Sequence, residues 1–130
     1  MTITRRAFGS KHKVSLFTLG TMRAVGSIEE MYLVLKEACL VGINHIETAP
    51  SYGPAELLLG ESLKRLADQK IRPHDGWVIT SKIIPGIAYP EGKKQIKLML
   101  SDLGLPKIDN LAIHGLNLSD HLQWAIDGEG

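Results

Sequence analysis

Short apolar runs alternate along the chain with longer segments whose apolar residues recur at helical spacing. Residues 14–19, 43–48, 77–83 and 108–114 are short runs with β-branched members, and each predicts a strand. The strands begin roughly 30 residues apart, which is the length of a strand–helix–strand unit. The chain therefore repeats one βα unit rather than mixing unrelated elements.

Three segments between these runs predict helices: residues 28–40, a segment that opens with Pro54, and a segment that ends at Gly104. Ser27 and Glu30 have the spacing of a capping box, which marks the start of the first helix. The helices fall between successive strands, so the strands are expected to run parallel.

Two α/β architectures fit this alternation, an open doubly wound sheet and a (β/α)8 TIM barrel. A dinucleotide-binding open sheet should carry G-x-G-x-x-G after its first strand, but residues 19–23 read LGTMR. The barrel is therefore favoured, although it needs eight units. Four strands, three helices and a helical stub at residues 119–126 predict a partial TIM barrel over residues 1–130, as one half of a barrel domain.

The composition is that of a globular domain without the excess of positive charge that binding to a polyanion requires. The chain has 130 residues, 44% of them apolar and 22% charged, with 15 Lys and Arg against 14 Asp and Glu. A net charge of +1 argues against nucleic-acid binding and against membrane-surface binding by bulk charge. No apolar run approaches the roughly 20 residues that span a bilayer.

The single cysteine, Cys39, excludes an internal disulfide framework and a cysteine-based zinc site. It lies within a helical apolar pattern, so we predict a buried small hydrophobe. Residues 4–8 are faintly similar to a twin-arginine export signal, but Arg23 interrupts the apolar segment that follows. We therefore predict a cytoplasmic protein.

Ionisable side chains stand near the carboxyl ends of three predicted strands, where barrel enzymes gather their chemistry. Glu47, Lys82 and His114 end the second, third and fourth strands, and Tyr52 follows the second. A lysine ammonium beside a tyrosine stabilises the phenolate, and a carboxylate can hold that ammonium in place. A histidine can donate a hydrogen bond to a carbonyl. The set describes a general acid for an oxygen that becomes an alkoxide, as in hydride reduction of a carbonyl.

Nearly the whole chain resembles the aldo-keto reductases, which are NAD(P)H-dependent (β/α)8 barrel enzymes. The resemblance rests on residues 19–23 (LGTMR), 42–53 (GINHIETAPSYG), 56–63 (ELLLGESL), 79–82 (ITSK) and 111–114 (LAIH). It implies reduction of an aldehyde or ketone, with NADPH as the default cofactor and a small carbonyl compound as substrate. It also implies that residues 5–9 form the small hairpin that closes the bottom of the barrel.

The resemblance assigns a role to each candidate. Tyr52 is implied as the proton donor, Lys82 as the cation that stabilises its phenolate, and His114 as the residue that orients the carbonyl. Glu47 stands at the position of the catalytic carboxylate. The residues implied to line the nicotinamide-ribose end of the cofactor are Gly20, Thr21, Met22 and Glu47. The tail from His114 to Trp124 is most similar to the branch that carries a C-terminal iron–sulfur extension.

The chain departs from the family pattern in two places. The family carboxylate is Asp, and the extra methylene of Glu47 displaces the charge by about 1.5 Å unless the rotamer folds back, so we expect reduced activity. The family residues for the carboxamide, the stacking aromatic and the 2′-phosphate lie in the second half of the barrel, beyond Gly130. We therefore expect a truncated product, a fragment, or a half-barrel completed by self-association or by another half.

Two other functions remain open on the sequence alone. A half-barrel without catalysis could serve as an interaction or regulatory module, with Glu47 and Lys82 as a purely structural ion pair. A metal-dependent barrel hydrolase could use His45, Glu47 and His114, although this set lacks further carboxylates, so no metal is expected. His45 is otherwise expected to face the helix layer or to make a polar core contact. The remaining histidines, His12, His74 and His121, are expected in solvated loops.

Overall fold

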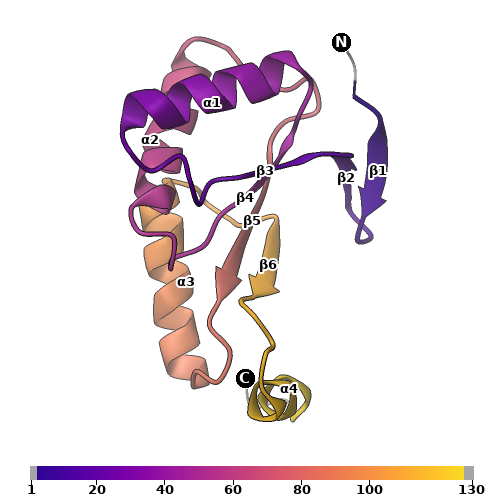
Figure 1. Cartoon of the computed structure of the whole chain (residues 1–130), viewed down its shortest axis with the longest axis vertical. Helices are drawn as coiled ribbons and strands as arrows, with labels where there is room; N and C mark the ends of the chain where they lie inside the picture. The colour runs from indigo at the N-terminus through magenta and orange to yellow at the C-terminus, as the bar shows by residue number, and fades with distance from the viewer. Residues whose placement is uncertain (1–2, 128–130) are drawn as a thin grey trace.

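The computed structural model describes residues 3–127, which form a parallel sheet with helices on one face (Figure 1). The sheet order is β3 (Thr18–Gly20), β4 (His45–Glu47), β5 (Val78–Ile83) and β6 (Asn110–Ile113). The connecting helices are α1 (Ile28–Leu40), α2 (Ala55–Asp68) and α3 (Tyr89–Leu103). The predicted class, a parallel α/β fold of four strands alternating with helices, is confirmed.

The core lies between the sheet and these three helices. Its fully buried members come from every layer: Met31, Leu35, Ile46, Leu59, Leu66, Ile79, Met99 and Leu103. Successive side chains of a strand point to opposite faces, so Ile46 packs toward the helices while its neighbours His45 and Glu47 face the other side. That other side corresponds to the interior of a barrel.

A two-stranded hairpin of β1 (Arg5–Phe8) and β2 (His12–Ser15) lies beside the sheet, away from the helices (Figure 1). Arg5 anchors it through hydrogen bonds of 2.6 Å to Gly42 O and 2.6 Å to Asp75 Oδ2. The Asn44 carboxamide accepts from Ser15 N at 2.8 Å, at the amino end of β4. The hairpin implied by the resemblance is therefore present at the amino ends of the strands.

The prediction of one continuous strand over residues 14–19 is wrong. Val14 and Ser15 end β2, the next two residues form a bend, and β3 begins at Thr18. The Ser15 hydroxyl donates to Phe17 O at 2.6 Å and so closes the bend. The apolar run is thus divided between two sheets, because a side-chain hydrogen bond competes locally with extended backbone.

The predicted helix boundaries agree with the structure. Ser27 Oγ accepts from Glu30 N at 3.1 Å, as in a capping box, whereas Glu30 Oε2 accepts from Gly26 N at 3.1 Å, one residue before the N-cap. Pro54 is the N-cap of α2, and Gly104 ends α3 in a left-handed conformation with φ 62°. The stub forms α4 (Ser119–Ile126), which lies beyond the carboxyl ends of the strands (Figure 1).

Three smaller expectations need correction. Cys39 is half-buried rather than fully buried, and burial still raises the pKa of its thiol. His121 lies in α4 and is half-buried, and His12 begins β2, so neither is a loop residue. His74 does lie in an exposed turn, as expected. Among the described residues, no helix has both the length and the apolar character needed to cross a bilayer.

Candidate active site

Two neighbouring strands present Glu47 and Lys82 on the same face of the sheet. Glu47 is the last residue of β4 and is paired with Thr80 of β5, two positions before Lys82. Because side chains alternate along a strand, Thr80 and Lys82 share the face that Glu47 occupies. The Lys82 ammonium forms an ion pair with Glu47 Oε1 at the carboxyl end of the sheet.

Tyr52 reaches the same point from the turn between β4 and α2. Its backbone N–H donates to Ala49 O at 3.0 Å, and Gly53 follows in a left-handed conformation with φ 60°. The Tyr52 hydroxyl accepts a hydrogen bond from Lys82 Nζ at 2.5 Å and donates to Glu47 Oε1 at 3.1 Å. Residues 30 positions apart in the sequence thus meet through one phenolic oxygen.

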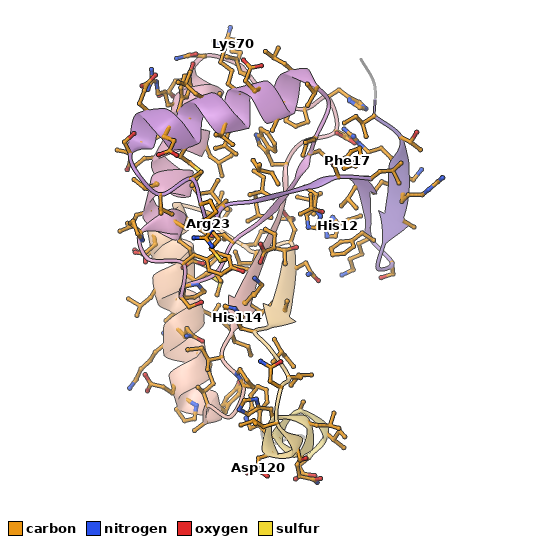
Figure 2. The ribbon with its side chains drawn as sticks, in the orientation of Figure 1. His12, Phe17, Arg23, Lys70, His114 and Asp120 are labelled. Atoms are coloured by element: carbon orange, nitrogen blue, oxygen red, sulfur yellow. The ribbon has the colours of Figure 1, made fainter. Side chains whose placement is uncertain are left out.

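His114 follows β6 and lies beside Tyr52. Its backbone N–H donates to Ile83 O at 2.8 Å, which continues the strand pairing beyond the last residue of β6. The His114 and Tyr52 rings meet edge to face, with centroids 5.6 Å apart and an angle of 87° between the planes. Figure 2 shows His114 at the end of the sheet toward which the strand arrows point. The four candidate catalytic residues are therefore brought together.

The Lys82–Glu47 pair is sheltered rather than surface-exposed. The Lys82 side chain is 15% exposed and that of Glu47 is 25% exposed. Burial lowers the pKa of Lys82, while a carboxylate in direct contact favours the charged ammonium. The ammonium also lies 4.4 Å from the Tyr52 ring centroid. Lys82 thus carries its charge beside both the phenol and the carboxylate.

The residues implied to meet the cofactor flank Glu47 on β3 and the loop after it. Gly20 is exposed, and a Cβ placed there would come within 3.6 Å of Glu47 Oε2. Met22 is 46% exposed. Thr21 is fully buried, its N–H donates to Glu47 O at 3.0 Å, and its hydroxyl donates to Thr48 Oγ1 at 2.9 Å. Gly20 and Met22 are therefore exposed to a ligand, whereas the buried Thr21 holds the loop through its hydrogen bonds to Glu47 and Thr48.

His45 lies on the inner face, so the expectation that it faces the helix layer is wrong, and the alternative of a polar core contact is confirmed. Its ring nitrogens each lie 2.8 Å from a threonine hydroxyl, those of Thr18 and Thr80. Burial lowers the pKa of His45. Within residues 3–127, no three His, Cys, Asp or Glu side chains are close enough to hold a metal ion. His45 contacts two threonine hydroxyls and Glu47 contacts Lys82, so neither side chain is free to bind the metal ion of a hydrolase.

Three residues around the site were not singled out from the sequence. Ser51 Oγ lies 3.1 Å from His114 Nδ1. On the helix side of β5, Ser81 Oγ donates to Glu56 Oε1 at 2.6 Å. A signal for Glu56 was present, because it occupies the apolar stripe of α2 three residues before Leu59. Ser51 and Ser81 each adjoin a candidate residue, but nothing in the sequence marks their partners.

The site is an open surface rather than a closed pocket. The structure has a cavity of about 750 Å³, but it lies on the helix side and is lined by residues of α2, α3 and the segment after α3. Leu63, Trp77 and Leu103 belong to its wall, and none of the four candidate catalytic residues does. The candidate site faces the uncovered inner side of the sheet instead.

Comparison with known proteins identifies the family and the fold of the chain. The sequence model of the aldo/keto reductase family matches residues 17–125, which is most of the chain. The chain belongs to the aldo/keto reductase family. The matched residues 17–125 contain all four candidate catalytic residues.

Solved structures of aldo-keto reductases share the fold. A Pseudomonas aeruginosa protein assigned to the aldo-keto reductases is 28% identical with a TM-score of 0.76, over 92% of this chain and 49% of that one. A Bombyx mori aldo-keto reductase in complex with NADP is 22% identical with a TM-score of 0.72, over 88% of this chain and 38% of that one. The chain thus spans half or less of these structures. No curated protein matches the chain significantly.

Proposed function

We propose that this chain supplies the catalytic half of an NADPH-dependent carbonyl reductase in which Tyr52 donates the proton. The contact that carries the proposal is the one between Lys82 Nζ and the Tyr52 hydroxyl, at 2.5 Å. As the proton leaves Tyr52 for the carbonyl oxygen of an aldehyde or ketone, the ammonium stabilises the phenolate that forms. Glu47 keeps the ammonium in place.

NADPH is the cofactor we propose, and when bound it supplies the hydride for the carbonyl carbon. The residues fit its nicotinamide-ribose end, because Gly20 leaves open the space beside Glu47 Oε2 that a side chain would fill. Met22 is exposed two residues after Gly20. Thr21, which lies between them, is fixed by the hydrogen bond from its N–H to Glu47 O. His114 is proposed to donate a hydrogen bond to the substrate carbonyl and so to orient it.

Turnover is proposed for the barrel that contains this half. Tyr52 is half-buried and the Lys82 side chain is 15% exposed, so water still reaches the site, and an enzyme of this kind must exclude water from the reacting atoms. A second half-barrel, from a further stretch of polypeptide or from another copy, would provide the missing walls. The alternative is a half-barrel without catalysis that acts as an interaction module.

NADPH binding by the purified chain, followed through the fluorescence of Trp77 and Trp124, tests the proposal. The mass of the species should be measured in the same buffer. We expect a Kd below about 100 μM, within the range of enzyme–ligand affinities. Gly20→Leu should weaken binding, because its side chain would fill the space beside Glu47. Absence of binding in a folded chain of any oligomeric state would favour the interaction module.

A further inference from the structure

Glu56 is a buried carboxylate that the proposed chemistry does not use. It lies in the first turn of α2, on the helix side of the sheet, and is only 4% exposed. Its Oε1 accepts a hydrogen bond of 2.6 Å from the fully buried hydroxyl of Ser81. Glutamate is seldom buried in this way, and burial raises the pKa of Glu56. An apolar residue would fill the same space at lower cost, so the bond calls for a functional reason.

The segment from the end of β4 to the start of α2 contacts three successive residues of β5. Thr48 N donates to Thr80 O at 2.9 Å, Ser81 Oγ donates to Glu56 Oε1 at 2.6 Å, and Lys82 Nζ donates to Tyr52 Oη at 2.5 Å. The first two contacts flank Tyr52 in the sequence. Ser81 and Lys82 point to opposite faces of β5, so the contact with Ser81 is made behind the site.

Tyr52 is fastened by its own backbone to the start of α2: its N–H donates to Ala49 O at 3.0 Å, and Ala55 N donates to Tyr52 O at 3.3 Å. Its neighbours Ser51, Gly53 and Pro54 are exposed. A Cβ at Gly53 would meet nothing within 4 Å, so the turn has open space around it. The position of the phenol along β5 therefore follows that of the start of α2, which the two flanking contacts join to β5.

We propose that Glu56 is a positioning residue, whose hydrogen bond to Ser81 fixes the start of α2 against β5 and thereby holds the Tyr52 hydroxyl on Lys82. This inference rests on the proposed role of Tyr52 as proton donor and deepens it. Glu56 acts through Ser81 and the backbone, and it touches neither substrate nor cofactor. Its neighbour Asp102 on α3 carries a like charge and gives it no alternative partner of opposite sign.

The full chain labelled with ¹³C at the hydroxyl-bearing ring carbon of tyrosine provides a readout that does not depend on activity. The signal of Tyr52 is identified by its loss in Tyr52→Phe. Lys82→Met then defines the shift that accompanies loss of the ammonium contact. We expect Ser81→Ala and Glu56→Leu to move the Tyr52 signal by more than half of that shift. Glu56→Gln keeps an acceptor for Ser81 and should leave the signal in place.

Ser62→Ala is the matched control. Ser62 is a fully buried serine of the same helix, but its hydroxyl donates to Ile28 O of α1 at 3.3 Å and not to β5. It should loosen α2 and leave the Tyr52 signal unmoved. The inference is overturned if Ser81→Ala leaves the signal unmoved in a folded chain, or if Ser62→Ala moves it as far. If Glu56→Leu fails to fold, Ser81→Ala alone tests whether the hydrogen bond positions Tyr52. NADPH binding tests the proposed function separately.

Discussion

Ser51 Oγ lies 3.1 Å from Nδ1 of His114, on the side of the imidazole ring away from Nε2. If the serine hydroxyl donates, Nδ1 is the acceptor and the ring proton resides on Nε2. That tautomer is the one able to donate a hydrogen bond from Nε2 to a substrate carbonyl. We therefore predict that Ser51, the residue before the proposed proton donor, favours the Nε2–H tautomer of His114.

Ser51→Ala should therefore give a mixture of His114 tautomers. ¹⁵N NMR of the imidazole is the measurement, with Ser51→Thr as the variant that keeps the hydroxyl. We expect turnover to fall about fivefold, the equivalent of one hydrogen bond of roughly 1 kcal/mol. A spectrum of Ser51→Ala that matches the unmodified chain would show that Ser51 does not set the tautomer.

Lys82→Met should abolish most of the proton-transfer step. Among the described residues, Lys82 is the only cation bonded to the Tyr52 hydroxyl, so its removal leaves the phenolate without a stabilising charge and Glu47 without its ion pair. In the completed barrel, turnover of NADPH with an aldehyde should fall by about 10²- to 10⁴-fold, the contribution of a positioned general acid. Lys94→Met is the control, because Lys94 pairs with Glu91 on the exposed side of α3. Equal loss in both variants would argue against a specific role for Lys82.

Glu47→Asp should increase turnover. The longer side chain still reaches Lys82 and Tyr52, but its second oxygen occupies the space beside Gly20. Aspartate withdraws the carboxylate from that space by about 1.5 Å, and misplacement of this size can cost up to 10²-fold in rate. We expect roughly a tenfold gain in steady-state turnover. A variant no faster than the unmodified chain would mean that glutamate is fully competent here.

The helices that the sequence predicts correctly begin and end at capping residues, whose effect depends only on neighbours a few positions away. Ser27 and Glu30 start α1 through contacts inside one helical turn, and Gly104 ends α3 through its own backbone conformation. Lys82 was conspicuous because a charged residue in an apolar strand needs a partner. The division of residues 14–19 between two sheets was not predictable from periodicity, because it depends on the bend closed by Ser15.

Only some of the site residues could be predicted from the sequence, because the others depend on contacts between distant residues. Lys82 and His114 stand at strand ends and Tyr52 in the turn after β4, so barrel topology brings all three to the same edge of the sheet. Ser51 and Glu56 act through partners 63 and 25 positions away, and only the folded chain shows that these pairs meet. His45 was assigned to the helix layer or a polar contact because strand alternation fixes a face only once the register is known.

Asp75→Asn should destabilise the chain fully above about pH 4, and the difference should shrink progressively as the pH falls further. A hydrogen bond from Arg5 holds the pKa of Asp75 below its usual value, and the same pair fastens the hairpin to the turn before β5. A lowered folded-state pKa gives stability that is complete above the unfolded pKa and is lost as the pH falls through the folded pKa. Because the pair is partly exposed, we expect about 1 kcal/mol.

Urea unfolding between pH 3 and pH 7, at roughly unit intervals, measures this difference directly. Glu91→Gln is the matched control, since it removes an ion pair whose two side chains are 65% and 70% exposed, and it should change the free energy of unfolding little. Arg5→Met should reproduce the pH dependence of Asp75→Asn, because either change removes the same ion pair. A difference between Asp75→Asn and the unmodified chain that persists unchanged at the acidic end would locate the effect in packing of the hairpin instead of in the charge.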